Sequence, residues 1–131
     1  MQGVYVVQPT RVSCNSPVYG REVTRIQRSN TSMIVKVGSS TCDLDKRCAS
    51  YGKGAKIIYQ DELHRDEFSK NDVLYIEGYM IETAQKAGFK LWRTKNNPQR
   101  KEYFRIKYSE LEEFMKVVKA AEEAAYCKIL S

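Results

Sequence analysis

The clearest structural signal in the chain is the segment Glu102-Tyr103-Phe104-Arg105-Ile106-Lys107-Tyr108. Its apolar and basic side chains alternate strictly, so that Tyr103 and Arg105 fall on the side opposite Phe104. A period of two residues is typical of a β-strand that buries one of its faces. The segment therefore predicts a strand with one core face and one basic, partly aromatic face.

A second alternating segment, Phe89-Lys90-Leu91-Trp92-Arg93-Thr94, comes before the first one. Residues 95–101 lie between the two and contain Asn96, Asn97 and Pro98, which favour turns. Two alternating segments joined by turn residues predict a β-hairpin. Because the connecting loop also carries three basic residues, the hairpin has a basic tip.

A helix is predicted directly after the hairpin. Ser109 and Glu112 have the spacing of a capping box, in which each side chain bonds the other's backbone N–H. Apolar side chains then recur at helical spacing, at Leu111, Phe114, Met115, Val118, Ala121 and Ala125. This pattern predicts an amphipathic C-terminal helix that packs on the sheet.

Residues 72–87 fit two structures. Asp72 could cap a helix and Gly88 could end one, which favours a helix up to Ala87. The same segment is rich in β-branched and aromatic residues, which are typical of a strand, and Gly78 weakens a helix. We expect the helix and keep the strand as the alternative.

The first half of the chain reads as short strands. Residues 4–7 are β-branched and aromatic, and Pro9 ends them. Residues 22–28 and 32–37 are expected to pair as a hairpin across a turn, and residues 55–59 to form one more strand. A further turn is expected to begin at Gly38-Ser39-Ser40.

These expectations define an α+β fold. It has a small antiparallel sheet or partial barrel, a basic β-hairpin and a C-terminal amphipathic helix. A length of 131 residues fits one domain, with a β-rich half over residues 1–59 and a mixed half over residues 60–131.

Charge is distributed unevenly along the chain. The net charge of +6 conceals a block over residues 86–107 in which eight basic residues face Glu102 alone. The preceding block, residues 60–85, holds seven acidic and two basic residues. Segregated charge produces local potentials that attract anionic partners, so the basic hairpin is the main functional candidate.

We expect a small, basic, non-enzymatic protein that binds DNA or RNA through this hairpin. Lysine and arginine neutralise phosphates, and the rings of Trp92 or Tyr103 could stack on bases. A second basic patch is expected around Arg21, Arg25 and Arg28 in the first half. The candidate residues are Lys90, Trp92, Arg93, Lys95, Arg100, Lys101, Tyr103, Arg105, Lys107, Arg21 and Arg25.

A protein-interaction module is the alternative. In this interpretation the basic hairpin docks on an acidic surface of a host enzyme or of the transcription machinery and inhibits or modulates it. The acidic block over residues 60–85 favours this alternative, because it would repel a duplex that lay across both blocks.

Catalysis and metal binding are minority interpretations. His64, the only histidine, lies among four acidic residues, which would suit a small metal-dependent hydrolase. Cys14, Cys42, Cys48 and Cys127 lack the Cys-x-x-Cys spacing of zinc sites. We therefore expect no catalytic residue, metal or cofactor. The apolar runs are too short to cross a membrane, so we expect no membrane partner.

Residues 19–59 resemble the small SH3/KOW-like barrels of phage accessory proteins. The resemblance is carried by Tyr19-Gly20-Arg21-Glu22-Val23-Thr24-Arg25-Ile26, Ile34-Val35-Lys36-Val37, Lys46-Arg47 and Gly52. It implies a phage-type regulatory factor that binds nucleic acid or host transcription proteins. The implied location is the cytoplasm, which is the host cytoplasm for a phage-encoded chain.

Overall fold

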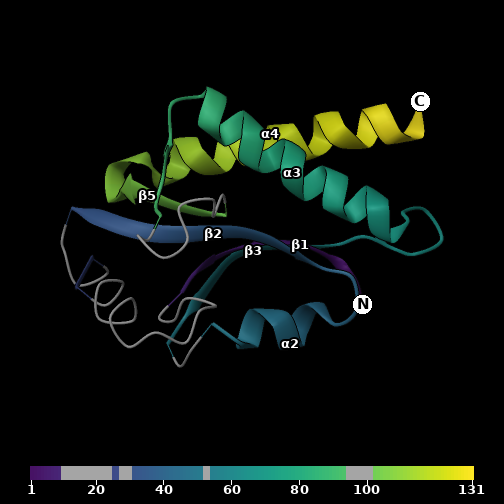
Figure 1. The fold of residues 1–131 in the computed structure, drawn as a ribbon, viewed down its shortest axis with the longest axis horizontal. Coiled ribbons are helices and arrows are strands. Elements are labelled where there is room, and N and C mark those ends of the chain that lie inside the picture. Colours follow the sequence, from purple (N-terminus) through teal and green to yellow (C-terminus); the bar gives the residue numbers. More distant parts are fainter. Residues whose placement is uncertain (10–24, 27–30, 52–53, 94–101) are drawn as a thin grey trace.

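The computed structural model describes residues 1–9, 25–26, 31–51, 54–93 and 102–131. An antiparallel five-stranded sheet has the order β3-β1-β2-β5-β4, with α3 and α4 on one face and α2 on the other (Figure 1). The elements are β1 (Gly3–Gln8), β2 (Ser32–Ser40), α2 (Leu44–Ala49), β3 (Lys56–Glu62), α3 (Lys70–Lys86), β4 (Lys90–Leu91), β5 (Tyr103–Lys107), the 3-10 turn η1 (Tyr108–Glu110) and α4 (Leu111–Leu130). The expected α+β class is confirmed.

The central strands β1 and β2 are buried on both faces, because helices cover both sides of the sheet. Val4 and Val6 point into the large core beneath α3 and α4. Tyr5 and Val7 alternate with them and join Leu44 of α2 in a smaller cluster on the opposite face. The sheet therefore separates an apolar side from a thinner and more polar one.

The predicted helix near residues 72–87 is confirmed as α3. Its N-cap is Ser69, whose hydroxyl accepts a hydrogen bond from the Asp72 amide at 3.1 Å. Asp72 is therefore the third helical residue of the capping box. The prediction that Asp72 itself caps the helix is wrong. Gly88, with φ of +99°, follows Ala87 and adopts the left-handed conformation that commonly ends a helix.

The predicted C-terminal helix is confirmed as α4, which buries Phe114, Val118, Ala121 and Ala125. The expected capping box at Ser109 is wrong, because Ser109 lies within η1. The side chain of Glu110 instead accepts a hydrogen bond from the Lys107 amide at 2.8 Å, which satisfies a backbone donor one turn earlier.

The pairing expected in the first half is wrong in two places. β2 pairs with β1 and β5 rather than with residues 22–28, of which Arg25 and Ile26 are helical. Residues 38–40 continue β2 and pair with β1 instead of starting a turn. Both errors follow from long-range strand pairing, which supplies β2 with partners that no local pattern reveals.

The five strands form an open sheet with β3 and β4 at its edges. Of the two predicted alternatives, the structure therefore has the open sheet and not the partial barrel. The resemblance of residues 19–59 to SH3/KOW-like barrels is not confirmed. The predicted hairpin is confirmed, since β4 and β5 pair antiparallel with Lys90 opposite Arg105. β4 has only two residues, however, and the basic tip over residues 94–101 lies outside the described residues.

Among the described residues, no helix is both long and apolar enough to cross a membrane.

A polar cluster joins α4 to β3. The Tyr59 hydroxyl donates to one carboxylate oxygen of Glu122 at 2.5 Å, and the Tyr126 hydroxyl contacts both Glu122 and Asp61. Glu122 is almost fully buried. Burial, reinforced by the neighbouring Asp61 carboxyl, raises the pKa of Glu122 to about 8. Lys119, whose ammonium lies 5.0 Å from the centre of the Tyr59 ring, opposes this increase.

We predict that the protein loses stability as the pH rises from about 4.5 to about 8. Glu122 is protonated in both states below its ordinary pKa of 4.5, but between 4.5 and about 8 only the unfolded chain ionises it. The free energy of unfolding should fall by about 2–4 kcal/mol across this window. Urea unfolding at several pH values measures it. Glu122→Gln should flatten the profile, and an unchanged profile in that variant would contradict the prediction.

Candidate functional site

The candidate site lies at the C-terminal half of β2. β5 pairs with β2 only as far as Lys36, and the last hydrogen bond between the two segments runs from the Val37 amide to the Glu102 carbonyl at 3.0 Å. Beyond this point, the described partner of β2 is β1 alone. Residues of α2 and α3 approach this part of β2 from opposite faces of the sheet.

Tyr5 forms the centre of the site. It is the register partner of Gly38 on the neighbouring strand, and its ring lies directly over that glycine. A Cβ atom at Gly38 would lie 2.5 Å from the Tyr5 hydroxyl oxygen. Gly38 is therefore the residue that allows the buried ring of Tyr5 to cross β2.

Three buried polar side chains form a chain of hydrogen bonds beside Gly38. Lys36 donates through Nζ to the hydroxyl of Tyr51, which in turn lies 2.5 Å from the hydroxyl of Tyr5. Lysine can only donate, so the Tyr51 hydroxyl accepts from Lys36. In the bond between the two phenols either hydroxyl can be the donor.

Lys36 is nearly fully buried, although burying a charged group is costly unless it is well partnered. Its ammonium lies 3.7 Å from a carboxylate oxygen of Glu102. It also lies 4.7 Å and 5.6 Å from the ring centres of Tyr51 and Tyr103. A buried, charged cluster of this kind is typical of a functional site.

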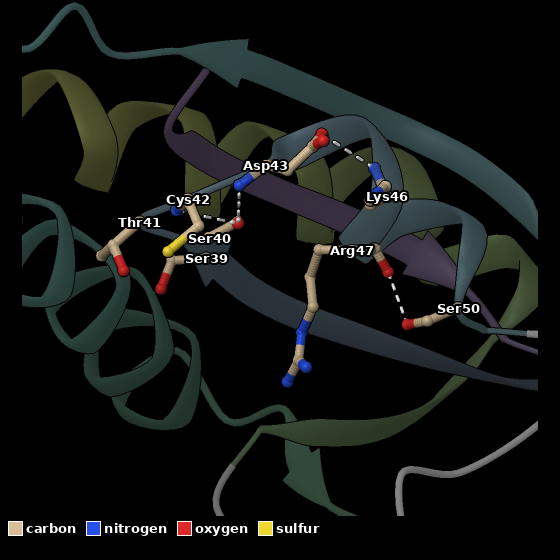
Figure 2. Close-up of a pocket in the computed structure, with 8 residues that line it drawn as sticks. All are labelled: Ser39, Ser40, Thr41, Cys42, Asp43, Lys46, Arg47 and Ser50. Carbon is tan, nitrogen blue, oxygen red and sulfur yellow. Dashed lines mark hydrogen bonds between the residues drawn. The ribbon is translucent and has the colours of Figure 1, made fainter.

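Arg47 brings a second positive charge to the site from α2. The side chain of Asp43 caps α2 by accepting from the Lys46 amide at 3.1 Å, which fixes the start of the helix. Figure 2 shows the exposed Arg47 side chain extending away from α2. A hydrogen bond to the Tyr5 hydroxyl, together with the neighbouring Tyr51, raises the pKa of Arg47.

Glu77 brings a carboxylate to the same site from α3. It accepts a hydrogen bond from the Ser39 hydroxyl at 3.0 Å. Burial raises the pKa of Glu77, while the Ser39 hydrogen bond and the charges of Lys36 and Arg47 oppose the increase. One carboxylate and two cations thus act on one another at the end of β2.

Both tyrosines of the site are held in their neutral form. Burial raises the pKa of Tyr5 and raises that of Tyr51 further, where the hydrogen bond to Tyr5 adds to the effect. Neutral phenols can donate and accept hydrogen bonds, so the site presents a phenol hydroxyl beside the guanidinium of Arg47.

A pocket of about 460 Å³ lies next to these residues (Figure 2). Ser39 and Arg47 belong to both the pocket and the cluster. The lining is rich in hydroxyls and cations, and consists of Ser39, Ser40, Thr41, Cys42, Asp43, Lys46, Arg47 and Ser50. Such a lining suits an anionic, oxygen-rich ligand.

The residues predicted from the sequence fall into three groups. Lys90, Arg93, Arg105 and Lys107 are exposed, and all of them except Arg93 line one pocket of about 360 Å³. Arg25 is also exposed, and the adjacent Ile26 packs against the hairpin. The remaining cations, Arg21, Lys95, Arg100 and Lys101, lie outside the described residues.

The two aromatic candidates are buried. Trp92 and Tyr103 pack edge to face with ring centres 5.9 Å apart, in a small cluster with Ile26 and Ile34. Neither ring presents a face to solvent, so the expected stacking on bases does not fit their positions. Alternation placed Tyr103 correctly on the basic side of β5 but could not show that other residues cover it.

The sequence did not predict these residues of the site: Tyr5, Lys36, Arg47, Tyr51 and Glu77. The available signal was a lysine within the apolar strand Val35-Lys36-Val37, followed by Gly38. His64 is exposed, with Glu62 at 3.8 Å. Within the described ranges, no three histidine, cysteine or acidic side chains are grouped closely enough to hold a metal ion.

The fold and this site define an α+β domain with a buried polar cluster beside a pocket. The chain belongs to the T5orf172 domain family, whose model matches residues 5–119. The matched range includes the whole cluster from Tyr5 to Glu77. No curated protein and no solved structure matches the chain.

We predict that Gly38→Ala destabilises the protein by about 1–3 kcal/mol, because the added methyl group overlaps the buried Tyr5 ring. Gly78→Ala is the matched control: nothing lies within 4 Å of a Cβ at Gly78 in α3, so it should stabilise the helix by about 0.5–1 kcal/mol. Thermal unfolding of both variants measures the difference. Equal effects of the two substitutions would show that Tyr5 does not depend on Gly38.

Proposed function

We propose that the protein binds DNA or RNA at the end of β2 and hydrolyses a phosphodiester bond there. The observation that carries this proposal is the convergence of Arg47, Lys36, Tyr5 and Glu77 from four separate elements. Cations for a phosphate, a hydroxyl donor and a single carboxylate are the groups that phosphodiester hydrolysis requires.

Arg47 is the residue best placed to hold the phosphate. It is exposed, it lines the pocket, and its planar guanidinium can donate two parallel hydrogen bonds to phosphate oxygens. Lys46 and the hydroxyls of Ser39 and Ser50 line the same pocket. In the transition state, Arg47 would stabilise the extra charge on the phosphoryl oxygens.

Glu77 is suited to hold a magnesium-like ion together with the substrate. Mg²⁺ keeps several of its waters and is bound by one or two carboxylates plus phosphate oxygens, so a single acidic side chain suffices. When bound, such an ion supplies polarisation of the phosphoryl group and a more acidic water. The Ser39 hydroxyl orients Glu77 through its hydrogen bond.

Tyr5 is suited to move the proton of the reaction. A water oxygen forms a new bond to phosphorus, the bond to the leaving oxygen breaks, and that oxygen takes the hydroxyl proton of Tyr5. The proton released by the attacking water restores Tyr5. Burial raises the pKa of Tyr5, but its hydrogen bonds to Tyr51 and Arg47 oppose this increase and would stabilise the phenolate.

This proposal departs from the expectation of a non-enzymatic protein, which rested on the lack of linear catalytic motifs. It keeps the expected nucleic-acid partner and the contribution of the hairpin cations to binding. An acidic protein partner would use the same cations but would give the Glu77 carboxylate no role. Membership of a phage-associated family supports the role of a phage accessory factor in the host cytoplasm.

We predict that purified protein cleaves labelled DNA or RNA when Mg²⁺ or Mn²⁺ is present. Glu77→Gln should lower the rate by at least about 100-fold, because the carboxylate charge is lost while the shape is kept. Arg47→Ala should lower it by about 100- to 1,000-fold. Gel electrophoresis of the products measures both rates.

Glu82→Gln is the matched control for Glu77→Gln, because Glu82 lies on the same helix, is exposed and forms an ion pair with Lys86 one turn along the helix. It should leave the rate unchanged. Unfolding temperatures of all variants show whether each has folded. Full activity of folded Glu77→Gln, or no cleavage of either nucleic acid by the wild-type protein, would refute hydrolysis.

A further inference from the structure

Exposed cations lie on the sheet at a distance from the pocket that Arg47 lines. Arg105 and Lys107 of β5 and Lys90 of β4 are exposed, and all three line a second pocket. Lys90 and Arg105 are register partners, so their side chains lie on the same face.

This basic group lies on the face of the sheet that carries Tyr5, Lys36 and α2 with Arg47, whereas Glu77 comes from α3 on the other face. Tyr103 is the register partner of Lys36, and its ring lies 5.6 Å from the Lys36 ammonium. Side chains two residues apart on a strand share a face, so Arg105 and Lys107 follow Tyr103 on that face. Figure 1 shows α2, which carries Arg47, on one side of the sheet and α3 and α4 on the other.

The strand register gives the distance between the pocket that Arg47 lines and the basic group of Arg105, Lys107 and Lys90. Arg105 lies opposite Ile34, and Lys107 lies opposite Ser32. Counted along β2 from Ser39 at the first pocket, these positions are five and seven residues away, or about 17 and 24 Å. A duplex rises about 3.4 Å per base pair, so the same distances correspond to about five to seven base pairs.

The aromatic side chains on this face favour a duplex over a single strand. Tyr5, Tyr51, Trp92 and Tyr103 are all buried. Proteins that bind single strands usually offer exposed rings on which bases stack. The described part of this face, with its exposed cations and buried rings, instead suits the phosphate backbone of a duplex, which is recognised by charge.

We infer that a nucleic-acid duplex lies along β2, with one phosphate at Arg47 and phosphates about five to seven base pairs away at Arg105, Lys107 and Lys90. The inference rests on the proposed function for the position of the first phosphate. It adds the substrate class, which is a duplex, and the shortest duplex that can contact both Arg47 and the basic group of β4 and β5.

The test measures binding without cleavage. Fluorescence anisotropy of the Glu77→Gln protein in EDTA is recorded with stem-loop DNAs of 4 and 12 base pairs and with a single strand. The 12-base-pair stem should bind at least 10-fold more tightly than the 4-base-pair stem and more tightly than the single strand. Adding Arg105→Ala and Lys107→Ala should reduce the length preference to 3-fold or less and lower the salt slope by about 2.

Lys86→Ala with Lys116→Ala is the matched control, because it removes the same charge from exposed positions of α3 and α4 on the opposite side. It should preserve the length preference. An unchanged preference in the Arg105 and Lys107 variant, or tighter binding of the single strand, would overturn the inference. Because binding is measured without metal, this result is independent of whether the wild-type protein cleaves nucleic acid.

Discussion

The ring of Tyr5 lies across β2 at Gly38, and this contact connects the core of the sheet to the candidate site. Around it, the two central strands are closed on both faces, so their register is strongly specified. The same register aligns Lys36 with Tyr103 on β5. The positions of Tyr5 and Lys36 in the candidate site are therefore a direct consequence of how the sheet is paired.

Elements with a local signal were predictable from the sequence. The alternation of β5, the stop at Gly88 and the apolar periodicity of α4 each depend on neighbours within a few residues. The pairing of β2 was not predictable in this way. Its partners, β1 and β5, lie about thirty and seventy residues away, and the turn-like residues around Ser40 are extended because β1 binds them.

The site shows the same division. Charge alone identified Lys90, Arg105 and Lys107 as surface cations, since a basic block in a hairpin must largely remain in water. Tyr5, Arg47 and Glu77 gave no such signal. A tyrosine in a strand, an arginine in a short helix and a glutamate in an amphipathic helix are each ordinary in isolation. Only the fold brings them within reach of one another.

The two faces of the sheet differ in thickness. One carries a large continuous core under α3 and α4, whereas the other carries two small clusters, one of them beneath the six residues of α2. Local opening requires the loss of few contacts on the thin side. Amide protons of α2 should therefore exchange with solvent through small fluctuations, whereas those of β1 should exchange only through global unfolding. The wall of the pocket can thus adapt to a ligand while Tyr5 stays fixed.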